Sequence, residues 1–170
     1  MLRILGIDPG FGRLGWGLIE SEGSKLRHVG HGCLETPASD AFMERLRTAR
    51  DYVRDLVTTH KPDAVAVEQL FFQTNAKTAI NVGMARGVIL LAIADAGVPM
   101  VELTPNQVKQ GVAGHGQADK KQVEQMVTRL LSLKETPKPD DAADALAIAI
   151  VGAVAYPRER RITEAARRDV

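Results

Sequence analysis

The chain has 170 residues, 45% hydrophobic and 25% charged, a composition typical of one globular domain with a substantial buried core. Its formal net charge of +1 excludes a globally basic protein, so any nucleic-acid-binding surface must be a local basic patch. The single cysteine, Cys33, excludes an intrachain disulfide and a cysteine-based zinc site. The sequence shows no leader-like segment and no apolar run of about 18 residues, so we expect cytoplasmic localisation.

The first predicted element is a buried strand over residues 2–8, which ends in a single carboxylate. Pro9 and Gly10 follow Asp8 and break the strand. Burying an ionised carboxylate is costly unless something compensates its charge, and a metal ion is a common compensation. Asp8 is therefore the first candidate metal ligand.

The later elements predict an α/β fold. Residues 14–20 alternate apolar residues with glycine, which indicates a strand with close packing at the glycines, and short turns join the first three strands into an antiparallel meander. Two further strands alternate with helices, which requires parallel pairing. We predict a mixed five-stranded sheet flanked by helices, with strands at 2–8, 14–20, 25–35, 64–68 and 100–103 and helices at 39–60 and 75–96. Residues 1–155 form one domain in this interpretation, and 156–170 form a basic, flexible C-terminal tail.

Three more carboxylates are expected near Asp8. Glu68 ends the fourth strand as Asp8 ends the first, and parallel strands place their carboxyl ends at one edge of the sheet. Asp140, Asp141 and Asp144 open an apolar helix, and capping explains one of them but not all three. Asp141 and Asp144 share a helix face. Four acids without cysteine or histidine suit Mg²⁺ or Mn²⁺, and two such ions would support phosphodiester cleavage.

The glycines after Asp8 also match a dinucleotide-binding fingerprint. Gly10, Gly12 and Gly15 have its spacing. That fingerprint requires a helix to begin at the glycines, whereas residues 16–18 continue as a strand. We interpret these glycines as allowing a backbone segment to pass close to Asp8.

The helix at 75–96 is apolar nearly all round, with Ala79, Gly83 and Gly87 spaced by four residues. A helix of this kind can be buried between the sheet and its neighbours, or it can form a subunit interface where small residues allow close approach. The pattern alone leaves both interpretations open.

Several residues are candidates for contact with nucleic acid. Phe71 and Phe72 follow Glu68 directly, and one exposed aromatic there could stack on bases, although packing against the next helix is an equal alternative. The segment from Gln69 to Ala94 contains no acidic residue. Basic residues in and after this segment could bind phosphate, although for any one lysine an ordinary solvated side chain is the favoured alternative. These are Lys77, Arg86, Lys109, Lys120 and Lys121.

Together these stretches resemble the RuvC-type Holliday junction resolvases, which have a ribonuclease H-like fold. The matching segments cover most of residues 3–151 in family order: ILGIDPG with GWGLIE, AVAVEQLFF, NAKTAINVGMARGV, NQVKQGVAGHGQADKKQV and DDAADALAIAI. The resemblance implies a Mg²⁺-dependent endonuclease, with Mn²⁺ able to substitute, that acts as a homodimer. It also implies paired nicks across a four-way DNA junction, 5′-phosphate and 3′-hydroxyl ends, and bacterial, nucleoid-associated action with branch-migration motor and junction-binding proteins.

The resemblance also implies roles for particular residues. Asp8, Glu68, Asp141 and Asp144 fall on the acidic metal ligands, and Phe71 falls on an aromatic near the junction crossover. Lys109 and Lys120 fall on basic residues near the scissile strand, and the 75–96 helix falls on the dimer interface. The loop 11–14 and the tail after Val151 match no family motif.

Two other functions share part of this sequence pattern. A ribonuclease H-like nuclease acting on RNA, such as a ribosomal RNA precursor, or on another DNA form would use the same acids. An actin-like phosphate or nucleotide binder shares the Asp-x-Gly turn but needs two such domains, for which 170 residues are too few. The helix start at Asp141 and Asp144, with the lysines near residue 120, favours the junction resolvase.

Overall fold

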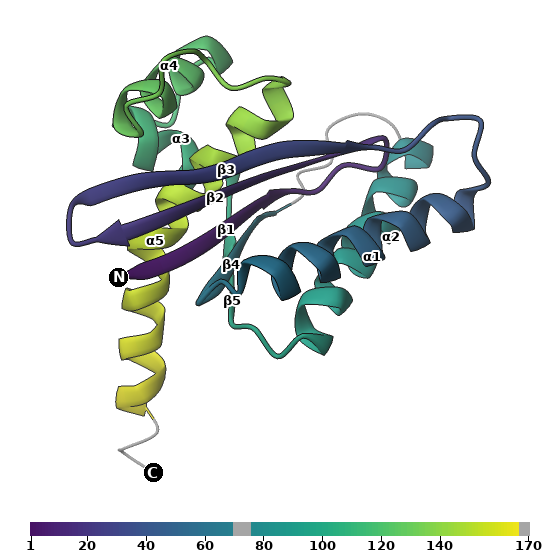
Figure 1. The fold of residues 1–170 in the computed structure, drawn as a ribbon, viewed down its shortest axis with the longest axis horizontal. Coiled ribbons are helices and arrows are strands. Elements are labelled where there is room, and N and C mark those ends of the chain that lie inside the picture. Colours follow the sequence, from purple (N-terminus) through teal and green to yellow (C-terminus); the bar gives the residue numbers. More distant parts are fainter. Residues whose placement is uncertain (70–75, 167–170) are drawn as a thin grey trace.

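The computed structural model describes residues 1–69 and 76–166, which form a five-stranded sheet with helices on both faces (Figure 1). The strands are β1 (Leu2–Asp8), β2 (Arg13–Glu22), β3 (Lys25–Glu35), β4 (Ala64–Glu68) and β5 (Met100–Leu103). The helices are α1 (Phe42–His60), α2 (Ala76–Asp95), α3 (Pro105–Ala113), α4 (Lys120–Leu130) and α5 (Asp140–Ala166). The predicted elements are confirmed, with ends that differ by a few residues.

The strand order is β3-β2-β1-β4-β5. The first three strands pair antiparallel, whereas β4 pairs parallel with both β1 and β5. This arrangement confirms the predicted mixed sheet, in which β1 lies at the centre and joins the meander to the parallel strands.

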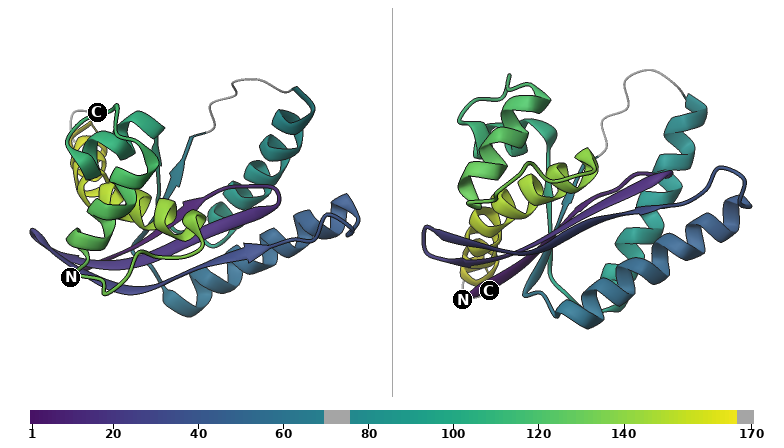
Figure 2. Two further views of the ribbon diagram at one scale, coloured as in Figure 1. Left: turned by 90° about the horizontal axis from the view of Figure 1, so that it is seen from above. Right: turned by 45° about the horizontal axis from the view of Figure 1, so that its top comes forward.

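The period of two along the central strands divides the core into two layers. Leu5, Ile7 and Val67 face α1 and α2, whereas Ile4 and Ala66 face α5. Figures 1 and 2 show α1 and α2 side by side on one face of the sheet and α3, α4 and α5 on the other. The side of the sheet on which a β1 or β4 residue lies therefore follows from whether its number is odd or even.

Helix α5 approaches the sheet so closely that several strand glycines, Gly6 and Gly15 most severely, have no room for a side chain. A Cβ atom at Gly6 would lie 2.1 Å from the carbonyl oxygen of Ala145, and a Cβ at Gly15 would lie 2.0 Å from that of Asp141. Both contacts are with backbone atoms, which cannot move without displacing the helix. The predicted close packing at the strand glycines is therefore confirmed at Gly15.

We expect Gly15→Ala to lower the free energy of unfolding by about 1–3 kcal/mol, because the new methyl group must push the start of α5 off β2. The urea midpoint measures this change. Gly12→Ala is the matched control, since the nearest atom to its new Cβ is a terminal nitrogen of Arg45 at an ordinary 3.6 Å. Equal midpoints for the two variants would contradict the steric argument.

Helix α5 continues past residue 155 to Ala166, and Pro157 lies inside it. The division of the chain into a domain at 1–155 and a flexible tail at 156–170 stays a prediction, and residues 167–170 lie outside the described part of the chain. Across the described residues, no helix is both long and apolar enough to cross a lipid bilayer.

Candidate active site

The last residues of β1 and β4 bring two carboxylates to one edge of the sheet, on one face. Ile7 pairs with Val67 in the parallel ladder, so Asp8 and Glu68 are the next residues along their strands. Both have even numbers and lie on the α5 side, as Ile4 and Ala66 do. Strand register and alternation thus place the two acids as neighbours without any loop.

Helix α5 supplies two more carboxylates to the same place. Its first turn lies against β2 at Gly15, the residue that pairs with Asp8. Asp141 and Asp144 lie one turn apart, with side chains 23% and 32% exposed. The neighbouring residues Ala142, Ala143 and Ala145 are fully buried, which anchors this turn. The structure therefore brings all four predicted acids together.

A pocket of about 240 Å³ opens between these elements. Asp8, Glu68 and Asp144 line it, together with Lys109 of α3 and Lys120 of α4. Its apolar wall comes from α3, α4 and α5 and consists of Pro105, Val108, Val123 and Ala147. Three acids and two lysines thus share one small cavity, which is a suitable environment for binding both a cation and a phosphate.

The carboxylates of this pocket resist ionisation. Burial raises the pKa of Asp8 to about 7, and the negative charges of the other three carboxylates add to the rise. Burial also raises the pKa of Glu68 to about 7; the charge of Asp144 adds to this shift and Lys109 opposes it. The pKa of Asp144 is raised by burial as well, against the attraction of Lys120. A bound cation would relieve this accumulation of negative charge.

The donor set fits a hard divalent cation. All candidate ligands are carboxylate oxygens, and Oδ2 of Asp141 is buried and accepts no hydrogen bond from the described residues. Arg13 Nη1 lies 3.5 Å from that oxygen, close enough for charge attraction only. Among the described residues, no three acidic, histidine or cysteine side chains already surround one point. Lys120 Nζ lies 3.1 Å from Asp144 Oδ2, one of the candidate ligand atoms.

The other predicted DNA-binding residues lie in different surroundings. Arg86 is 16% exposed and bridges two strand ends: Nε donates to the Glu68 carbonyl at 3.4 Å, and Nη2 lies 2.5 Å from Glu102 Oε2. Lys121 is exposed in the first turn of α4. Phe71 and Phe72 lie outside the described residues, and the Lys77 side chain is not described. DNA contact by these residues stays a prediction.

Helix α2 buries one face and exposes an apolar one. Ala85 is buried, and Ile89 and Ile93 are buried in the core layer that includes Leu5, Ile7 and Val67 of the sheet. A row that we call the α2 stripe is exposed on the other side, and it consists of Ile80, Met84, Gly87 and Leu91. Of the predicted interface residues, Gly87 lies in this row, while Ala79 and Gly83 are half-buried beside it.

Two arginines at the site were not predicted from the sequence. Arg13 pairs with Glu35, Asp140 and Asp141, and its partnership with Glu35 could have been read from the pairing of β2 with β3. Arg45 of α1 lies 3.8 Å above the ring of Phe11 and donates to the Phe11 carbonyl at 3.3 Å. Arg45 thereby holds the loop that follows Asp8.

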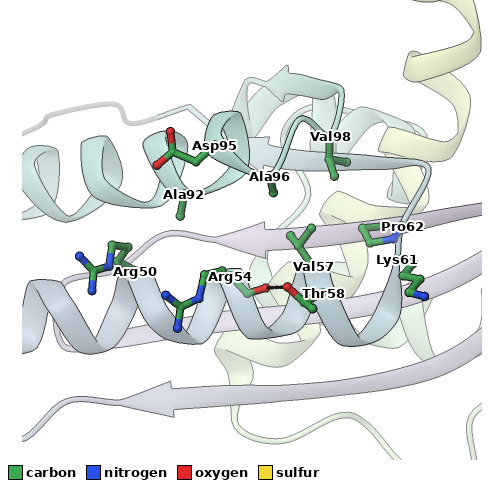
Figure 3. A pocket seen from close by; sticks show the side chains of 10 residues that line it. All are labelled: Arg50, Arg54, Val57, Thr58, Lys61, Pro62, Ala92, Asp95, Ala96 and Val98. Carbon is green, nitrogen blue, oxygen red and sulfur yellow. Dashed lines mark hydrogen bonds between the residues drawn. The ribbon is translucent and has the colours of Figure 1, made fainter.

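A larger cavity, of about 670 Å³, lies at the other end of the sheet between α1 and α2. Figure 3 shows Arg50, Arg54 and Lys61 on its α1 side and Asp95 on its α2 side. One carboxylate among three cations cannot supply the ligands for a divalent metal ion. The smaller acidic pocket is therefore the candidate active site.

Known proteins of one nuclease family match this chain over most of its length. The family model described as crossover junction endodeoxyribonuclease RuvC matches residues 4–152. The chain is 53% identical to the crossover junction endodeoxyribonuclease RuvC of Rubrobacter xylanophilus over 153 residues, which cover 90% of this chain and 86% of that protein. It is 49% identical to the Moorella thermoacetica protein of the same name, over 98% of this chain and 100% of that one.

Solved structures of RuvC proteins also match this chain. The Thermus thermophilus RuvC structure superposes with a TM-score of 0.83 at 40% identity, covering 93% of this chain and 96% of that one. T. thermophilus RuvC in complex with Holliday junction substrate gives a TM-score of 0.85 at 40% identity, over 90% and 93% of the two chains. By sequence and by its ribonuclease H-like fold, the chain belongs to the RuvC family of crossover junction endodeoxyribonucleases.

Proposed function

We propose that this protein resolves four-way DNA (Holliday) junctions in recombination and repair by metal-dependent phosphodiester hydrolysis. The observation that carries the proposal is the meeting of Asp8, Glu68, Asp141 and Asp144 at one sheet edge, beside a pocket lined by two lysines. Relatives at about half identity bear the name of this activity, and one solved relative is bound to a Holliday junction.

The four carboxylates would hold Mg²⁺, two ions per site, with Mn²⁺ able to replace it. When bound, such ions would activate a water molecule and stabilise the leaving 3′-oxygen, so that the products would carry 5′-phosphate and 3′-hydroxyl ends. Lys109 and Lys120 would bind the phosphate oxygens of the scissile strand from the rim of the pocket. Burial of Asp8 and Glu68 keeps bulk water from competing for the cation.

The DNA surface would extend from this pocket along residues that follow Glu68. Phe71 and Phe72 would stack on unpaired bases at the crossover, and Lys77, Arg86 and Lys121 would add positive charge. Arg86 also donates to the Glu68 carbonyl, so it would hold the end of β4 as well as add charge.

A homodimer would place two such pockets on one junction, so that paired nicks can be made. The α2 stripe supports this arrangement because Ile80, Met84 and Leu91 are each more than half exposed on one helix face. Ala79, Gly83 and Gly87 would allow a second α2 helix to approach closely. Branch-migration motor and junction-binding proteins would be further partners, in the bacterial cytoplasm and at the nucleoid.

The alternative substrate is another nucleic acid, such as a ribosomal RNA precursor, because the acids alone do not select a junction. A four-way junction and a linear duplex of the same sequence separate the two cases. We expect tighter binding to the junction at matched salt, and Mg²⁺-dependent nicks in two strands of like polarity. Equal affinity for both DNAs, or cleavage of RNA in preference to junctions, would contradict the proposal, since phosphate contacts do not distinguish DNA shapes.

A further inference from the structure

One lysine bridges the start of α4 and the start of α5. Lys120 Nζ lies 2.5 Å from Asp140 Oδ2 and 3.1 Å from Asp144 Oδ2. Asp144 lines the acidic pocket, whereas Asp140 does not. The ammonium group therefore stands between a carboxylate inside the pocket and one outside it.

The position of Lys120 is fixed by its backbone. It is the first residue of α4 and follows Asp119, which caps the helix. The Asp119 side chain accepts a hydrogen bond from the Gln122 backbone N–H, and the Gln122 side chain accepts one from the Asp119 backbone N–H. Asp140 is equally fixed as the first residue of α5, the helix that packs against β1 and β2. The ammonium can thus move between its two partners by side-chain rotation alone, without a change in either helix.

Without a metal, Lys120 supplies the positive charge beside Asp144. A divalent cation bound by Asp144 would lie close to this ammonium and would be repelled by it. A metal ion on Asp144 Oδ2, the oxygen that Lys120 contacts, therefore requires Lys120 to withdraw from that oxygen. Asp140 offers a partner for the withdrawn ammonium, and it makes the shorter of the two contacts already.

We propose that Asp140 is a positioning residue that draws the Lys120 ammonium out of the acidic pocket when the metal enters. In the loaded site Lys120 stays at the pocket mouth on Asp140, where it can bind a DNA phosphate. The proposal rests on the metal-dependent function proposed above, and it assigns a role to an aspartate that otherwise opens a helix and lies 3.9 Å from Arg13 Nη1.

The test measures Mg²⁺ binding to the full-length protein without DNA. The Mg²⁺ dissociation constant follows from the rise in melting temperature with MgCl₂ concentration, against NaCl at equal ionic strength. We expect Asp140→Asn to weaken Mg²⁺ binding about two- to fivefold, the range for one exposed charge pair. Asp140→Glu, which keeps the carboxylate, should restore most of the loss.

The decisive comparison is the same substitution in a Lys120→Gln background. If Asp140 acts by holding Lys120, Asp140→Asn has no effect on Mg²⁺ binding once the lysine is absent. An equal loss in both backgrounds would overturn the proposal, because Asp140 would then act only as one more negative charge. An unchanged Mg²⁺ dissociation constant in the Asp140→Asn single variant would also overturn the proposal. Failure of the wild-type protein to cut junctions would instead contradict the proposed function, which this titration does not measure.

Discussion

Asp8→Asn is expected to abolish Mg²⁺-dependent junction cleavage, by about a thousandfold or more, while leaving junction binding nearly unchanged. Asp8 ends the central strand and lies near the negative charges of the other three acids, so its loss removes the ligand at the centre of the proposed metal site. Single-turnover cleavage and a mobility-shift titration measure the two properties separately. Retained cleavage would contradict the metal-site assignment, whereas loss of both properties would indicate misfolding.

The same substitution should make the metal-free protein more stable above neutral pH. The folded-state pKa of Asp8, about 7, lies above the ordinary value of 3.8, so the folded state binds more protons than the unfolded state between these values. Stability from this group is present at low pH and is lost as the pH rises toward 7. We expect Asp8→Asn to gain roughly 1–3 kcal/mol at pH 8 and nothing at pH 4.

The measurement compares the melting temperatures of the variant and the wild-type protein at pH 4 and pH 8, with a metal chelator present. With EDTA present, the variant should melt several degrees above the wild-type protein at pH 8, at roughly 2–4 °C for each kcal/mol. Added Mg²⁺ should narrow the difference by stabilising the wild-type protein alone. A variant that is less stable at pH 8 would show that the Asp8 carboxylate contributes favourably to the fold, contrary to its burial among like charges.

Met84→Asp is expected to convert a dimer into monomers and to raise the dissociation constant of the dimer more than about a hundredfold. The new carboxylate would lie in the middle of the α2 stripe, where association would bury it without a partner. Sedimentation velocity at micromolar concentration measures the change. Because Met84 is 52% exposed, the monomer should keep its fold and its circular dichroism.

Val154→Asp is the control for this experiment, since Val154 is an apolar residue of α5 with a similar exposure of 54%. It should leave the dimer intact. The Met84→Asp monomer should still nick junctions slowly at one strand but lose the paired nicks. A wild-type protein that sediments as a monomer, or a Met84→Asp dimer, would exclude the α2 stripe as the interface.

The strands were predictable because local signals define them. The bounds of β1, β3, β4 and β5 agree with the prediction, since an alternating or apolar run ends in each case at a turn residue or a charge. The four acids were predictable for a related reason: the carboxyl ends of parallel strands meet, and an acidic first turn of a buried helix must face the sheet.

The cation contacts were not predictable from local pattern. Arg86 is a candidate DNA contact from the sequence because its own segment lacks acids. Its partner Glu102 lies 16 residues later, on β5, the strand next to β4. Lys120 and Asp140 are likewise 20 residues apart and meet only because α4 packs on α5. Local charge counts do not include partners brought in by tertiary packing.

The pairing of β1 with β4 has a consequence for which changes natural variation can tolerate. Ile7 pairs with Val67, and the alternation of sides puts both following acids under α5. One residue inserted within Ala64–Val67 would turn Glu68 toward α1 and α2 while the strand could still pair. A single-codon insertion here would thus give a folded protein in which Glu68 no longer lies beside Asp8. Lineages of this protein should therefore vary in length at the loops between elements and keep β4 constant in length.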